Sequence, residues 1–243
     1  MKVVHNIALK ELATSVCWNP TDQNRFCIVG DDKQIEIWDI RASKATAKIA
    51  SLGSNLFASW SSDGKYIATS NTNDTLAVFD AAAAKLLKKV SFKYEINEFA
   101  WSANSDHILI ATGPVGGGLD MGNIDIVSFH SEDLSYLEAI PAHTSNCSCL
   151  KIDNSFRKLA LGSTDYLVSI WDLEEMICTS TVSCLETVVR SLSFNGNGLS
   201  LSHSLSLSLS LSLSLSLSLS LSLSLIYIYI YIYISFSLFL LIS

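Results

Sequence analysis

Short apolar runs alternate with polar turns along the first 198 residues of the chain. Five segments open in the same way, with an apolar strand that ends on a large residue and is followed by a polar turn. They read SVCWNP, FASWSSDGKYIATS, EFAWSANSDHILIAT, CLKIDNSFRKLALGS and VVRSLSFNGNG. The turns are rich in Asn, Asp, Ser and Gly, which favour tight turns through their side-chain hydrogen bonds or their backbone freedom. The pattern predicts strands throughout this region, because no stretch before residue 199 sustains the 3.6-residue period of a helix.

The large residues that end these strands recur at a nearly constant spacing. They are Trp18, Trp60, Trp101, Ile152 and Phe194, separated by steps of 42, 41, 51 and 42 residues. The longest step contains the glycine-rich stretch GPVGGGLDMG, which predicts an enlarged hairpin loop. A further strand closes each of the first four units with an aromatic–Asp pair or its remnant, in IEIWDI, LAVFDA, IDIVSF and VSIWDL. Alternation of apolar and polar residues in this strand is typical of half-buried β-structure.

A repeat of about 40–45 residues with several short strands and a Trp-Asp ending is typical of the WD40 β-propeller. We therefore predict an all-β fold in which residues 1–198 form a partial WD40 β-propeller of about four blades plus a fragment. A single blade cannot bury both of its faces, so the blades are expected to stack side by side.

Two Asp–Trp pairs at equal spacing indicate hydrogen-bond networks inside the blades. Asp32 precedes Trp38 by six residues, and Asp165 precedes Trp171 by six. In WD40 blades an Asp at this place lies in the turn before the third strand and shares hydrogen bonds with the Trp, a hydroxyl and a His from the preceding loop. Only the fourth unit offers that histidine, as His143. We predict a structural network that is complete in this unit alone, and the spacing does not identify its hydroxyl.

Charge limits the class of partner. The chain has 16 Lys and Arg against 23 Asp and Glu, a net charge of −7, and its last charged residue is Arg190. An acidic domain lacks the electrostatic footprint of a protein that grips phosphate backbones directly. The N-terminal MKVVHNIALK lacks the long apolar core of a secretory signal peptide.

The sequence predicts no catalytic residue, cofactor or metal. His143 and Asp165 resemble a general base and the group that orients it, but no nucleophile accompanies them. Cys147 and Cys149, in NCSC, form at most half of a metal site, because no matching His/Cys pair follows. The residues favour a non-catalytic protein that binds other proteins and has no small-molecule substrate.

Several stretches go beyond the general repeat and resemble the THO-subunit-3 family of WD40 proteins. They are DDKQIEIWDIRASKA (31–45), FKYEINEFAW (92–101), AHTSNCSCLKID (142–153), STDYLVSIWDLEEMIC (163–178) and VVRSLSFNGNG (188–198). The resemblance implies a normally seven-bladed ring, of which this chain holds an incomplete copy. It also implies a nuclear scaffold that binds other THO and transcription–export subunits and contacts mRNA indirectly, through them.

Residues 199–243 form a low-complexity tail of a different kind. Eleven Ser-Leu pairs run from Ser204 to Leu225, and Ile and Tyr then alternate to Ile234. TC and AT dinucleotide tracts encode such pairs, so we predict translated microsatellite DNA without a selected function. The rival is a membrane tether, since 225–243 is uncharged and long enough to cross a bilayer. Strict strand-like alternation and the lack of flanking Lys or Arg argue against a membrane role.

The sequence is also compatible with two other functional classes. The same fold serves as an adaptor in other complexes, for example as the substrate receptor of a ubiquitin ligase, and the tail would make the chain a membrane-tethered protein. Propeller binding surfaces lie on loops that carry no fixed motif, so the sequence does not identify the partner-binding residues.

Overall fold

The structure is a computed structural model that describes residues 7, 9, 11–113, 121–130, 133–183, 185–195 and 201–205. The described residues form eighteen β-strands and no helix, which confirms the all-β prediction. Since none of them is helical, none provides a helix long and apolar enough to cross a membrane. Apart from 201–205, the predicted low-complexity tail and the whole of its membrane-tether segment, 225–243, lie outside the described residues.

Sixteen of the strands form four antiparallel sheets, each a blade whose strands pair in chain order. Blade 1 consists of β1 (Ala13–Trp18), β2 (Arg25–Gly30), β3 (Gln34–Asp39) and β4 (Ala47–Ala50). Blade 2 consists of β5 (Asn55–Trp60), β6 (Tyr66–Asn71), β7 (Thr75–Asp80) and β8 (Lys85–Ser91). Blade 3 consists of β9 (Ile96–Trp101), β10 (His107–Thr112), β11 (Gly122–His130) and β12 (Asp133–His143). Blade 4 consists of β13 (Cys147–Ile152), β14 (Lys158–Ser163), β15 (Val168–Asp172) and β16 (Ile177–Val182). A fifth unit pairs β17 (Val189–Phe194) with β18 (Leu201–Leu205).

The predicted repeat matches the strand boundaries. Each of the five spaced residues, from Trp18 to Phe194, is the last residue of the first strand of its unit. The long third step has two sources. Residues 114–120 of the glycine-rich stretch lie outside the described residues, but β11 and β12 are also extended, at 9 and 11 residues.

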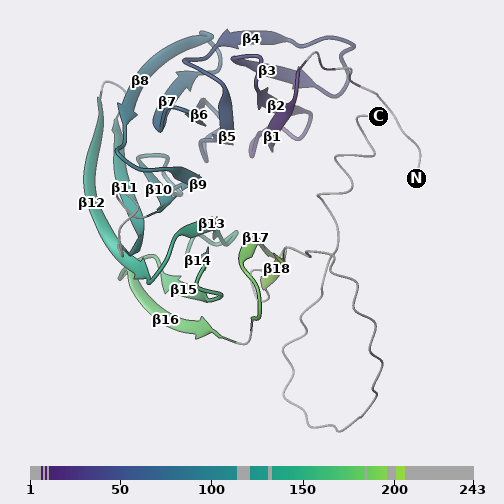
Figure 1. The fold of residues 1–243 in the computed structure, drawn as a ribbon. Helices are drawn as coiled ribbons and strands as arrows, with labels where there is room; N and C mark the ends of the chain where they lie inside the picture. The colour runs from purple at the N-terminus through teal and green to yellow at the C-terminus, as the bar shows by residue number, and fades with distance from the viewer. Residues whose placement is uncertain are drawn as a thin grey trace, which may run out of the picture.

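The blades are arranged as an arc around a common centre (Figure 1). The first strand of each blade lies nearest the centre and the fourth forms the outer rim, as β12 and β16 do in Figure 1. This arrangement is that of WD40 propeller blades, as the sequence predicts.

Neighbouring blades pack face to face through hydrophobic clusters. Between blades 1 and 2, Ile35 and Ile37 pack with Ile67 and Phe79. Similar clusters join blade 2 to blade 3, blade 3 to blade 4, and blade 4 to β17. Because both faces of blades 2 and 3 are covered, inner strands such as β6 are buried along almost their whole length. Removal of this apolar surface from water is the main term that stabilises the stack.

The tryptophans that end the first strands also set the register between blades. The indole N–H of Trp60 donates to the backbone carbonyl of Cys17 in blade 1, at 3.1 Å. The indole of Trp101 does the same to the carbonyl of Ser59 in blade 2, at 3.3 Å. In both cases the acceptor directly precedes the tryptophan of the neighbouring blade. In blades 2 and 3 an indole donor thus aligns the blade with the one before it.

The turns lie on two opposite faces of the arc. The first face carries the turns that join first to second strands and third to fourth strands in each blade. The second face carries the turns between second and third strands and the links from one blade to the next.

Candidate functional site

The structure brings His143, Asp165 and Trp171 together on the second face and adds Ser169 as the hydroxyl. His143 ends β12 of blade 3, Asp165 lies in the turn before β15, and the other two lie on β15. The imidazole Nδ1 is 3.1 Å from a carboxylate oxygen of Asp165, and Nε2 is 2.8 Å from Ser169 Oγ. The indole N–H of Trp171 donates to the same Oγ at 2.8 Å. The four side chains join the outer strand of blade 3 to blade 4.

Donor and acceptor chemistry determines where each proton of this network lies. An indole N–H only donates, so Ser169 Oγ accepts from Trp171. The hydroxyl proton of Ser169 then points to Nε2 of His143, which accepts it. The remaining ring proton is on Nδ1 and is donated to Asp165. Each of these side-chain polar atoms has at least one hydrogen-bond partner within the protein, which is the arrangement of a structural network.

The environment keeps Asp165 ionised. Burial acts to raise the pKa of this carboxyl, but the neighbouring imidazole of His143 and the backbone N–H of Leu167 lower it by more. The result is a pKa below the usual value of 3.8. The His143 side chain is only 1% exposed, so no substrate atom reaches its ring nitrogens. The pair is therefore unsuited to general-base catalysis.

Acid is expected to destabilise the protein. Among the residues that the structure describes, five carboxyls have pKa values below the usual 3.8: Asp39, Asp63, Asp106, Asp153 and Asp165. Such a group binds fewer protons in the folded than in the unfolded chain, so its stabilising contribution is complete above 3.8 and is lost as the pH falls through the folded value. Urea midpoints measured from pH 6 to pH 2.5 should fall steeply only below about pH 4. An Asp165→Asn variant should show a shallower fall, and a midpoint that stays constant down to pH 2.5 would contradict the expectation.

The place that Ser169 occupies holds a different residue in every blade. The backbone register puts Glu36 of β3, Ala77 of β7 and Asp125 of β11 at the equivalent position. Each stands two residues before the position of Trp171 in its own third strand. This interior position was not singled out by the sequence pattern, although its fixed offset from the Trp-Asp pair was available as a signal.

In blade 1 a carboxylate replaces the hydroxyl. The Trp38 indole N–H donates to Oε2 of Glu36 at 3.0 Å, and the other oxygen of Glu36 pairs with Lys48 of β4. Asp32 instead accepts the backbone N–H of Gln34 at 3.2 Å and stabilises the turn before β3. Asp32 and Trp38 therefore serve separate interactions and are not joined as His143, Asp165 and Trp171 are.

Blades 2 and 3 depart further from this network. In blade 2 the equivalent position is Ala77, next to the apolar cluster. In blade 3 Asp125 is fully buried and accepts the hydroxyl of Tyr136 at 3.1 Å. Burial and the neighbouring Asp125 raise the pKa of Tyr94 above its ordinary value. The hydroxyl of Tyr136 thus bonds the buried Asp125 at the position that Ser169 holds in blade 4.

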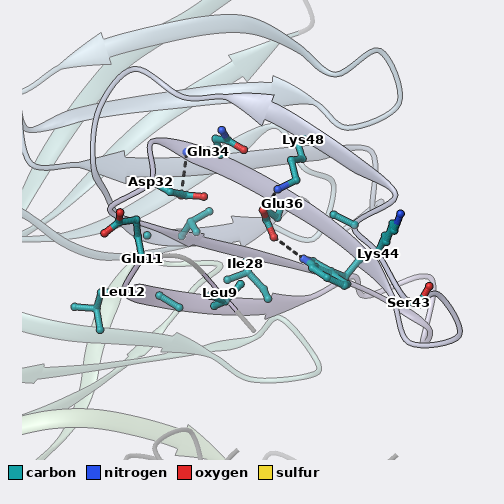
Figure 2. Close-up of a pocket in the computed structure, with 15 residues that line it drawn as sticks. Leu9, Glu11, Leu12, Ile28, Asp32, Gln34, Glu36, Ser43, Lys44 and Lys48 are labelled. Atoms are coloured by element: carbon teal, nitrogen blue, oxygen red, sulfur yellow. Dashed lines mark hydrogen bonds and ion pairs between the residues drawn. The ribbon is translucent and has the colours of Figure 1, made fainter. Parts of the chain in front are cut away.

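A pocket of about 880 Å³ lies along the face of blade 1 (Figure 2). Its lining includes Leu12, Ile28, Asp32, Glu36 and Lys48. Figure 2 shows the Glu36 carboxylate directed toward Lys48, with Asp32 beside Gln34. In blade 2 the equivalent face packs against blade 1. In blade 1 this face forms the wall of the pocket, which therefore has the residues of a blade-packing surface. Within the described ranges no group of three or more His, Cys, Asp or Glu is placed to hold a metal.

The cysteines of NCSC point to opposite faces of β13. Cys147 lies in the cluster between blades 3 and 4, whereas Cys149 lies in the cluster against β17. Burial raises the pKa of both thiols, that of Cys149 to about 12. Residues two apart share a face in a regular strand, but the pairing of β13 with β14 shifts register between Cys147 and Cys149. The two sulfurs therefore lie on opposite faces and cannot share one metal. They are protonated core residues.

Comparison with known proteins identifies the repeat and its relatives. Residues 8–39 and 134–172 match the family described as "WD domain, G-beta repeat". THO complex subunit 3 of Arabidopsis thaliana is 35% identical over 180 residues, which cover 74% of this chain and 54% of that protein. WD repeat-containing protein AAC3 of Dictyostelium discoideum is 32% identical over 184 residues, covering 74% of this chain and 37% of the relative. Cell division cycle 20.1, cofactor of APC complex, of Arabidopsis thaliana is 26% identical over 160 residues, covering 63% and 33%. The match thus spans about half or less of the length of these relatives.

Proposed function

Because this chain is a WD40-repeat protein and a homologue of THO complex subunit 3, we propose that it is a non-catalytic scaffold of a nuclear mRNA-processing and export complex. The observation that carries the proposal is the 35% identity to that subunit over 180 residues. The partners would be other subunits of the complex. With a net charge of −7, the chain would contact mRNA through those partners and not directly.

The geometry supports binding without catalysis. His143, Asp165 and Ser169 resemble catalytic types, but their hydrogen bonds are used to join blades 3 and 4. Glu36 is likewise paired with Lys48 and Trp38. The side chains left for function lie on the turns of the two faces, where a protein partner can reach them.

Co-purification tests the proposed function. The full chain, tagged and expressed in cells of its source, is expected to recover THO subunits from a nuclear extract at 150 mM salt. A Phe79→Asp variant, which places a charge in the core between blades 1 and 2, is the matched control for capture by unfolded protein. Recovery of no THO subunit, or equal recovery with the variant, would contradict the proposal.

An adaptor role in a different complex is the second candidate. It is favoured by the 26% identity to a relative whose name describes a cofactor of the APC complex. The same purification decides between the two, since APC subunits in place of THO subunits would establish the adaptor role.

A further inference from the structure

A second groove, of about 410 Å³, lies on the first face between blades 3 and 4, which are neighbours in Figure 1. Its lining is mainly apolar and includes Ile126 and Leu137 of blade 3 and Phe156, Leu173 and Met176 of blade 4. Leu137 is 52% exposed and Phe156 is 40% exposed, so neither is covered by the fold. None of the networks described above uses these residues.

Phe156 has a backbone conformation that disfavours a bulky side chain. Its φ is +55°, in the left-handed region where most residues with a Cβ are strained. The equivalent turn position is Gly64 in blade 2 and Ser105 in blade 3, with φ of +71° and +63°. The Asp153 carboxylate enforces the turn by accepting the N–H groups of Arg157 and Lys158 at 2.8 and 2.7 Å. The fold requires the turn, but it does not require an aromatic residue at its strained position.

The turn between the third and fourth strands of blade 4 also has a large residue at a left-handed position where blade 2 has a small one. Met176 of blade 4 has a φ of +51°, and the equivalent residue of blade 2 is Ala84, also at +51°. Blade 4 therefore places a large apolar side chain at both left-handed positions that border the groove, where other blades have Gly, Ser or Ala. Strain of this kind is kept where a side chain serves a function beyond folding.

The groove also carries an excess of negative charge. The stretches 102–107, 152–156 and 173–176, whose ends line the groove, hold four carboxylates and no Lys or Arg: Asp106, Asp153, Glu174 and Glu175. Lys158 stands opposite Asp172 in the β14–β15 ladder, and Glu138 stands opposite the lining residue Ile126. Glu174 and Glu175 are exposed at the tip of the turn between Leu173 and Met176.

From these features we infer that the groove between blades 3 and 4 docks a peptide segment of a partner protein, with one bulky apolar side chain flanked by Lys or Arg. The apolar side chain packs on Phe156 and Met176, and the flanking cations lie against the acidic rim. The inference rests on the proposed scaffold function and names one of its surfaces.

Peptide binding to the full 243-residue chain tests this inference. The probes are 13-residue Gly-Ser peptides on an array, each with one central Leu, Met, Phe or Trp and two Lys on either side. Matched probes carry Ala at the centre or Glu in place of Lys, and the strongest binder is then measured in solution by fluorescence anisotropy. We expect the Ala and Glu probes to bind at least tenfold more weakly.

Two variants and one control show whether Phe156 and Met176 bind a peptide or only stabilise the fold. Phe156→Gly and Met176→Ala install the residues of blade 2, so each should keep its melting temperature within about 3 °C and still weaken binding at least tenfold. Tyr166→Gly removes another exposed aromatic at positive φ, on the second face, and should leave binding unchanged. A large loss of stability in Phe156→Gly would instead make Phe156 a structural residue and overturn the inference.

The remaining outcomes are equally decisive. Absence of binding that depends on the central side chain, or binding that survives in Phe156→Gly, refutes the peptide site. So does self-association in sedimentation that Phe156→Gly abolishes while no peptide binds, because the groove would then hold a second copy of the chain. If THO subunits co-purify with Phe156→Gly as with the unaltered chain, the scaffold function stands and only the groove assignment fails.

Discussion

Truncation of Phe79 to alanine is expected to lower the free energy of unfolding by about 3–5 kcal/mol. The ring is fully buried and packs against Ile35, Ile37 and Ile67 in the cluster between blades 1 and 2. Removing it loses the burial of an aromatic side chain and leaves a cavity that two rigid sheets cannot close. Urea denaturation followed by tryptophan fluorescence measures the effect, with Trp60 in the same cluster as a reporter.

The control is a truncation on the outer rim. Ile177 of β16 is 55% exposed, so Ile177→Ala should change the free energy of unfolding by no more than about 0.5 kcal/mol. Equal effects of Phe79→Ala and Ile177→Ala would show that the face between blades 1 and 2 contributes little, contrary to the packing described above.

Replacement of His143 by alanine is expected to cost about 1–3 kcal/mol of stability. The variant leaves Ser169 Oγ–H without its acceptor in a buried site and removes one donor to the Asp165 carboxylate, which keeps those of Thr144 and Leu167. The loss arises from polar groups left unsatisfied more than from the volume removed. It is measured as a shift of the urea midpoint at pH 7.

A double-mutant cycle distinguishes this mechanism from a packing loss. Ser169→Ala in the His143→Ala background should cost less than the same change in the unaltered chain, because the hydroxyl no longer has an imidazole to bind. His130→Ala at the exposed end of β11 is the matched histidine control and should have little effect. An unchanged midpoint in His143→Ala, or strict additivity of the two changes, would refute the network as a source of stability.

The strands were predictable because each blade is built from local signals. Period-2 alternation, turn residues and a large residue at the end of each first strand mark the boundaries without knowledge of the neighbours. Trp60 and Trp101 therefore end β5 and β9 as the spacing predicts. The extra length of blade 3 was less clear, because β11 and β12 lengthen by pairing with each other, and their register includes bulges that no local pattern shows.

The polar residues inside the blades also divide into those that a local pattern indicates and those that it does not. His143, Asp165 and Trp171 stand at offsets from the repeat, so the sequence indicated them together. Ser169 and Glu36 were not identified, because their position, two residues before the Trp, holds a different residue type in each blade.

The sequence by itself determined the all-β class, the number of complete blades among the described residues and the turns between them, since these depend on residues close together in the chain. Only the tertiary structure decided which polar groups meet. Glu36 reaches Lys48 across β3 and β4, and the hydroxyl of Tyr136 on β12 reaches Asp125 on β11. Face-to-face stacking of separate sheets likewise places Phe156 and Met176 beside blade 3. Contacts between segments this far apart depend on the angle and register of packed sheets, which a linear pattern of apolar and polar residues does not encode.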